Sequence, residues 1–186
     1  SYPAFASRAP FLFSRAGRWA PGLVIAATLL YMGVNSLQRS GVVLNNAFPQ
    51  DKFKEASQWL AANARPKEIV FNPHWDTFAM LFFWNPANYY INGMDPIFLY
   101  AYDQNQYWRL HFIATDKASD TTCPLIRCNG VQIENTYDVL KNKFRASYIF
   151  VQKLRIPRFT AYLEQDRAHY EKTFDNKSEA IFRIRR

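Results

Sequence analysis

Glycine is scarce in this sequence, with only six among 186 residues. No G-x-G-x-x-G follows an apolar strand, no G-x-x-x-x-G-K-[ST] loop occurs, and no G-x-S-x-G elbow is present. The signatures of dinucleotide-binding, P-loop and α/β-hydrolase proteins are therefore missing. The formal charge of +8 comes without a nucleic-acid-reading motif, so we predict no nucleic-acid partner.

Acidic residues are missing from residues 1–40, and all charge is missing from residues 19–37, WAPGLVIAATLLYMGVNSL. A helix over residues 19–37 would span about 28 Å, close to the ~30 Å hydrocarbon core of a bilayer. The run is long for a cleaved signal peptide, no A-x-A site follows it, and it lacks the polar face of a soluble surface helix. The sequence therefore predicts a transmembrane helix over residues 19–37.

The arginines around this run predict its orientation. Three arginines precede it and only Arg39 follows closely, so the positive-inside rule places the N-terminal side in the cytoplasm. Because the chain begins with Ser1 rather than Met, we interpret it as processed or cut from something longer. Residues 1–18 are then a cytoplasmic loop or the end of a preceding element. Residues 41–186 are predicted to form an extracytoplasmic (periplasmic or outer) domain at the cell membrane.

Cysteine is nearly absent, and the two that occur, Cys123 and Cys128, stand in a C-x4-C spacing. Zinc ribbons use pairs of C-x2-C, and no histidine lies close enough in sequence to complete four ligands. A small disulfide loop is the favoured interpretation and suits an oxidising compartment. Free thiols and a metal site are the alternatives.

Apolar periodicity and turn residues predict that helices and strands alternate after the membrane run. Strands separated by helices indicate a parallel sheet covered on both faces. We therefore predict an α/β fold: a small, mostly parallel sheet with helices on both faces and a C-terminal antiparallel hairpin, preceded by one transmembrane helix. The expected helices are 51–63, 75–84, 95–103, 103–115, 135–144 and 156–169, the strands 68–71, 88–92 and 146–152, and the hairpin 170–186.

Aromatic residues crowd the segment between His74 and Asp95. Residues 75–84, WDTFAMLFFW, are apolar almost throughout and predict a buried helix, and residues 88–92, NYYIN, predict a strand at the centre of the sheet. Core packing is the favoured role of these aromatics, and a platform on the membrane, on a larger protein or on a glycan is the alternative. The set comprises Phe78, Phe82, Phe83, Trp84, Tyr89 and Tyr90.

Polar residues at the ends of these elements are candidates for lining a substrate site, because open α/β sheets bind ligands beyond the carboxyl ends of their strands. Asp76 or Thr77 can instead cap a helix, and Asp95, followed by Pro96, suits an N-cap. A metal site is a further alternative, although we assign no metal ligand and no catalytic residue. The substrate-lining candidates are His74, Asp76, Tyr89, Tyr90, Asp95 and Asp103.

Taken with the apolar run before it, the stretch EASQWLAANARPKEIVFNPHWDTFAMLFFWNPANYYINGMDPIFLYAYDQNQYW, followed by ASYIFVQ and YEKTFDNKSEAIFRIRR, resembles a known arrangement. It is similar to the C-terminal transmembrane helix and extracytoplasmic domain of polytopic GT-C class membrane glycosyltransferases. The resemblance covers residues 19–186. It rests on the W-L pair of the helix EASQWLAAN, the V-F pair of the strand EIVF, the W-D pair at residues 75–76, the segment YINGMDP and the closing hairpin.

This resemblance implies that the chain is an accessory extracytoplasmic domain of a glycosyltransferase that transfers a sugar from a lipid-phosphate donor. The catalytic acid of that class lies in a first outside loop that this chain does not contain, so the segment itself is expected to hold no cofactor. The parent enzyme is expected to use a divalent metal and a polyprenyl-phosphate sugar donor. Expected partners are membrane lipid, the remaining transmembrane part and a glycan or lipid-linked acceptor.

Two rival hypotheses belong to other classes. The first is a membrane-anchored binding or assembly module without catalytic activity. The second is a stand-alone enzyme whose site includes His74, Asp76 and Asp95.

Overall fold

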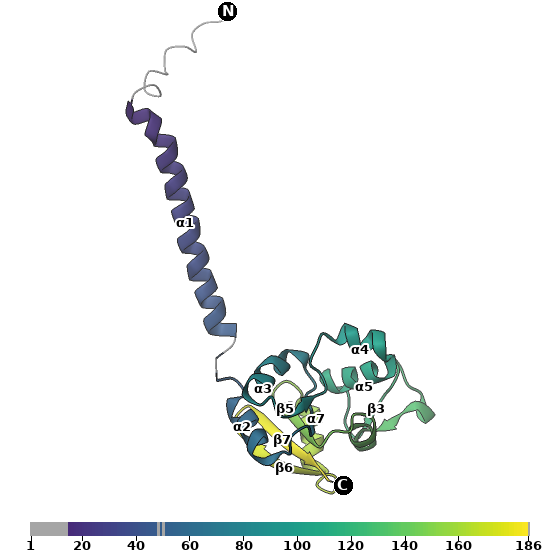
Figure 1. Ribbon diagram of the computed structural model, residues 1–186. Coiled ribbons are helices and arrows are strands. Elements are labelled where there is room, and N and C mark those ends of the chain that lie inside the picture. Colours follow the sequence, from purple (N-terminus) through teal and green to yellow (C-terminus); the bar gives the residue numbers. More distant parts are fainter. Residues whose placement is uncertain (1–14, 48, 50, 186) are drawn as a thin grey trace, which may run out of the picture. The chain divides into compact units, whose positions relative to one another are not determined.

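The computed structural model describes residues 15–47, 49 and 51–185 (Figure 1). The chain divides into two compact units, Ser1–Gln50 and Asp51–Arg186. Residues 1–14, most of the predicted cytoplasmic segment 1–18, lie outside the described residues.

One apolar helix near the N-terminus dominates the first unit. Helix α1 runs over Arg15–Ala47, and Trp19–Val42, 24 residues, is long and apolar enough to cross a membrane. None of this apolar window is buried. A membrane anchor and a signal sequence both have this character. The candidate span is longer than the predicted 19–37 because the helix continues past Leu37.

The second unit is a mixed α/β domain around one five-stranded sheet, with strand order β2-β1-β5-β7-β6. Its elements are α2 (Lys54–Asn63), β1 (Ile69–Phe71), η2 (Trp75–Thr77), α3 (Phe78–Trp84), β2 (Tyr89–Tyr90), α4 (Pro96–Tyr102), α5 (Gln104–Ala114), β3 (Thr121–Thr122), η3 (Gly130–Gln132), β4 (Glu134–Asn135), α6 (Thr136–Asp138), the π-helix η4 (Val139–Lys143), β5 (Tyr148–Gln152), α7 (Pro157–Gln165), β6 (Tyr170–Asp175) and β7 (Glu179–Ile184).

The prediction of a mostly parallel sheet is wrong. Strands β2, β1 and β5 are parallel, whereas β5 pairs antiparallel with β7, and β7 with β6. The helices between the first three strands provide the crossovers that parallel strands need. The terminal hairpin then adds β7 directly beside β5, so β7 is an interior strand and half of the pairings are antiparallel.

Helices cover both faces of the sheet, as predicted, because the strand side chains alternate between two cores. In β5, Phe150 packs toward α2 and α3 with Val70 and Ile181, whereas Ile149 packs with Phe182 on the other face. Helices α5 and α7 and the segment α6–η4 cover that second face. Strand β5 is therefore the buried centre of the domain (Figure 1).

The aromatic segment departs from its predicted place. Helix α3 forms as expected, but among its residues only Leu81 is fully buried, and Phe83 is 69% exposed. Strand β2 is an edge strand rather than a central one. The composition shows that this segment is apolar, but it does not say whether a neighbouring element covers it.

Candidate functional site

The carboxyl ends of β1, β2 and β5 meet at one edge of the sheet, because these strands are parallel. Two asparagines join the segment that follows β1 to the segment that follows β2. Asn72 Nδ2 donates to Asn92 O at 3.0 Å, Asn92 N donates to Asn72 Oδ1 at 3.2 Å, and Asn92 Nδ2 donates to Pro73 O at 2.8 Å. Both asparagines are buried. They fix the segments after β1 and β2, which carry three of the six candidate residues, His74, Asp76 and Asp95.

His74 follows β1 and is 7% exposed. Its Nε2 lies 3.0 Å from Ala114 O, and a carbonyl only accepts, so Nε2 carries the proton. Burial lowers the pKa of His74, and the Arg155 guanidinium lowers it further. The ring is therefore neutral near pH 7, and its contact holds the C-terminal end of α5 against the loop after β1.

Asp76 does not cap a helix, contrary to one interpretation of the sequence. Its two oxygens accept hydrogen bonds from Arg155 Nη1, each at 2.8 Å. The hydroxyl of Thr77 donates to His74 O at 2.6 Å and likewise caps nothing. The partner of Asp76 lies 79 positions along the chain, which is why local spacing did not reveal it.

Asp95 and Asp103 are N-caps. Asp95 Oδ1 accepts from Ile97 N at the start of α4, and Asp103 Oδ1 accepts from Gln106 N at the start of α5, both at 3.0 Å. The capping interpretation of Asp95, with Pro96 at the first helical position, is confirmed. Capping accounts for both side chains without a ligand.

The two candidate tyrosines lie on the edge strand β2 and point to opposite faces. The Tyr90 hydroxyl donates to Asn85 O at 2.9 Å and lies 3.3 Å from Leu81 O, and burial raises the pKa of Tyr90. Tyr89 is mostly exposed. Within the described part of the chain, no hydrogen bond or ion pair joins any two of the six predicted substrate-lining residues, and no three His, Cys, Asp or Glu side chains gather as a metal-binding group.

A cluster of four rings on α4 and α5, which the sequence analysis missed, has the geometry of a binding surface. We call Tyr100, Tyr107, Trp108 and His111 the α4–α5 ring cluster. Tyr107 lies 5.1 Å from both Tyr100 and Trp108, and it stacks on His111 at 5.7 Å with an interplanar angle of 22°. None of the four rings is fully buried. Only the spacing of Tyr107, Trp108 and His111 within α5 was a signal in the sequence, because the contact with Tyr100 depends on how α4 packs on α5.

Burial lowers the pKa of His111, and the Lys117 ammonium lowers it further. The ring cluster is therefore uncharged near neutral pH. Neutral aromatic faces suit stacking on another neutral ring better than capture of an anion.

A hollow of about 490 Å³ lies next to α5, and none of the four rings of the cluster lines it. Phe112, whose ring centroid lies 6.2 Å from that of His111, lines it together with Thr122, Cys123 and Ile133. Lys117 and Arg127 also line it and give the hollow two cationic groups. Its size falls in the range of small-molecule sites.

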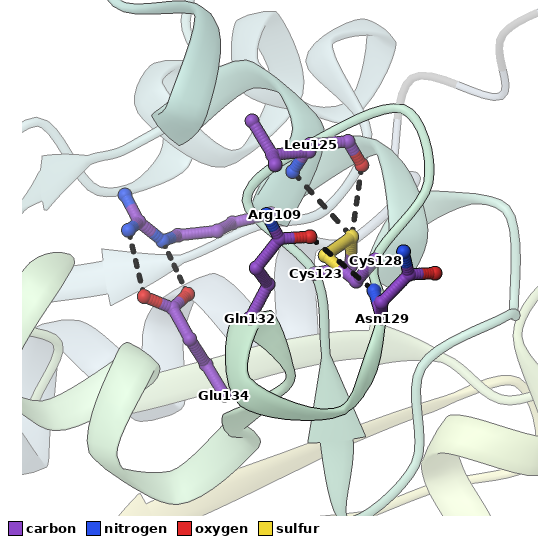
Figure 2. The surroundings of a disulfide bond; sticks show 7 residues. All are labelled: Arg109, Cys123, Leu125, Cys128, Asn129, Gln132 and Glu134. Atoms are coloured by element: carbon purple, nitrogen blue, oxygen red, sulfur yellow. Dashed lines mark hydrogen bonds and ion pairs between the residues drawn. A yellow bond between two sulfur atoms is a disulfide. The ribbon is translucent and has the colours of Figure 1, made fainter.

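The wall of this hollow is held by a disulfide and a partly buried ion pair (Figure 2). Cys123 and Cys128 are bonded, which confirms the predicted disulfide. Arg109 on α5 donates from Nε and Nη2 to the two oxygens of Glu134 at 2.6 and 2.8 Å. Asn129 N donates to Gln132 Oε1 at 3.3 Å. The disulfide and the Asn129 bond hold the loop 120–134 together, and the Arg109–Glu134 pair ties it to α5.

A second hollow, of about 1000 Å³, lies near the amino end of β5 and has a different chemistry. Charged groups dominate its lining, and Tyr148 is its single aromatic ring. Neither the predicted candidates nor the α4–α5 ring cluster contributes to it. Its charged lining residues are Arg65, Glu68, Lys141, Arg145, Glu171, Arg183 and Arg185.

Comparison with protein-family models, curated proteins and solved structures finds nothing that matches this chain. The candidate site therefore stands on its geometry.

Proposed function

We propose that this chain is a membrane-anchored accessory domain of a glycosyltransferase, and that the α4–α5 ring cluster holds a saccharide acceptor. The observation that carries the proposal is this set of four contacting, partly exposed rings beside a hollow. Flat apolar faces of sugar rings stack on aromatic rings. The similarity of the segment from EASQWL to YINGMDP to GT-C enzymes supports the choice of parent enzyme.

The proposed placement puts residues 51–186 outside the cytoplasm. Two independent features support it: the Cys123–Cys128 disulfide suits an oxidising compartment, and arginines gather before the apolar helix. Sugar transfer from the lipid-phosphate donor, and any divalent metal that assists it, is assigned to the rest of the parent enzyme. In this proposal the domain binds and orients the acceptor.

The test is saccharide binding by the full chain in lipid nanodiscs, read by saturation-transfer NMR with a panel of oligosaccharides. We expect saturation-transfer signals from bound sugar. The Kd should rise at least about tenfold in Tyr100→Ala and in Trp108→Ala, because anchoring aromatics contribute about 2 kcal/mol to binding. Leu154→Ala removes an exposed apolar side chain that belongs to neither proposed surface and is the control. Unchanged binding in both cluster variants would refute the assignment of the cluster.

A second function, a binding or assembly module without an enzymatic parent, is favoured by the exposed side chains of α4. Ile97, Phe98 and Tyr102 are all exposed, Tyr102 to 90%. The reading frame upstream of Ser1 separates the two functions. Many hydrophobic spans with an acidic residue in the first outside loop would support the glycosyltransferase, and a start codon within a few residues would support the module.

A further inference from the structure

We propose that one face of the η2–α3 segment rests in the headgroup region of a lipid bilayer. This outer face of α3 consists of Trp75, Ala79, Phe82 and Phe83. The inference goes beyond the saccharide site and does not depend on it, because it rests on a different part of the domain.

The outer face of α3 is a continuous helical stripe. All four residues are exposed, Trp75 to 49% and Phe83 to 69%. Their spacing of four, three and one places them on one side of a helix. The opposite side carries the buried residues Thr77 and Leu81. A helix that is apolar all round normally lies within a core, whereas here only one side does.

Charge is missing from this region of the chain. Residues 77–94 contain no Asp, Glu, Lys or Arg. Phe78 stacks on Phe82 with ring centroids 5.4 Å apart, and Phe83 contacts Trp84 at 4.9 Å, so the rings support one another at the surface. Soluble domains rarely leave such apolar surface uncovered, and where they do, it marks a contact with a membrane or a partner.

The outer face of α3 adjoins the point where the chain enters the domain. Phe53 is buried and packs edge-on against Phe150 at 5.1 Å, which fixes the entry point in the core. Lys54, at the start of α2, places its ammonium 4.8 Å from the Trp84 ring. The end of α3 therefore lies beside the first residues of α2.

A bilayer is the occupant that these features favour. The apolar helix ending at Ala47 precedes Lys54 by seven positions, and a chain of that length reaches at most about 25 Å. Trp and Tyr concentrate at membrane interfaces, where their rings meet the headgroups, and lysines nearby attract anionic lipid. The outer face supplies the ring of Trp75, and Lys54 supplies the charge beside the end of α3.

The experiment places a tryptophan probe on this face in the full chain, reconstituted in nanodiscs of phosphatidylcholine and phosphatidylglycerol. Phe83→Trp is compared with Val131→Trp, a fully exposed apolar position on η3, which directly precedes β4 in the separate two-stranded β3–β4 sheet. For each variant, the emission of the unsubstituted chain is subtracted. Quenching is then measured with lipids brominated near the headgroup end of the acyl chains.

We expect the Phe83→Trp emission to shift to shorter wavelength and to be quenched at least twofold more than that of Val131→Trp. Emission that is blue-shifted but not quenched would mean that protein covers the face, and it would overturn the proposal. Emission at the wavelength of water-exposed tryptophan, or equal quenching of both probes, would also overturn it. Phe82→Trp repeats the measurement on the same face if Phe83→Trp fails to fold.

Discussion

Strand β5 and helix α3 have similarly apolar sequences, YIFVQ and FAMLFFW, but different surroundings. Side chains of β5 alternate between two helix-covered cores, and four of its five residues are buried. Helix α3 packs one side against the domain and exposes the other. The comparison teaches that apolar composition makes contact with water unfavourable for a segment, whereas the neighbouring elements decide whether the segment is covered.

The largest expected effect is the loss of stability on truncating a ring in β5, compared with the small loss on truncating one in α3. Phe150→Ala should lower the free energy of unfolding by about 4 kcal/mol, because it leaves a cavity beside Phe53. Phe83→Ala should change it by about 0.5 kcal/mol or less, because an exposed ring loses few contacts. Denaturant unfolding in detergent micelles, followed by circular dichroism, measures both. Equal losses would mean that the outer face of α3 is covered after all.

The same contrast between buried and exposed groups applies to ion pairs. Glu134→Gln should cost about 2–3 kcal/mol, since it leaves the buried Arg109 guanidinium without its charged partner. Glu171→Gln removes the exposed partner of Arg183 and should cost about 0.5 kcal/mol. The same unfolding assay compares them. A larger cost for Glu171→Gln would contradict the importance of burial here.

Removal of the disulfide should have a slightly smaller effect. Replacing both Cys123 and Cys128 with serine should cost about 2 kcal/mol, because the bond closes a short loop and constrains the unfolded chain only modestly. Thermal unfolding with and without reductant measures the loss. Reductant should destabilise the unsubstituted chain and leave the double variant unchanged, and an effect of reductant on the double variant would contradict the assignment.

The smallest expected effect is a pH dependence from His74. Burial lowers its pKa in the folded state below the ordinary value near 6.5, so the unfolded chain binds the proton more readily. Its contribution to stability is complete above pH 6.5 and falls as the pH drops from there toward the folded pKa. Unfolding between pH 5 and 8 should show stability rising with pH.

His74→Gln should flatten that dependence. His111 has a pKa shifted in the same direction by burial, so His111→Gln is the matched control and should flatten it in part. A slope of opposite sign in the unsubstituted chain would contradict both assignments.

Local patterns predicted much of the domain. Asp95 with Pro96, Asp103, and Pro157 at the first position of α7 mark helix starts that the structure confirms. The strands β1 and β5 and the terminal hairpin follow from short apolar runs and turn residues. These elements depend on residues that are close in sequence, and so their signals are complete within the segment.

Features that depend on distant residues were not predictable in the same way. A helix cap and a substrate-lining role were the two interpretations of Asp76, and neither points to its partner, Arg155. The place of β7 beside β5 and of β2 at the edge depends on pairings between remote strands. The α4–α5 ring cluster depends on how two helices pack, and the exposure of Phe83 depends on the absence of any element in the described domain that covers it.

The interior position of β7 has a consequence for synthesis on the ribosome. This strand, the last of the sheet in sequence, fills the place between β5 and β6. Until residues 179–184 emerge, β5 presents an open edge of unpaired backbone groups, to which another nascent chain can add. A stop codon only a few codons before residue 179 would therefore leave β6 without its partner strand and β5 with an open edge, so the sheet cannot close before the last residues are made.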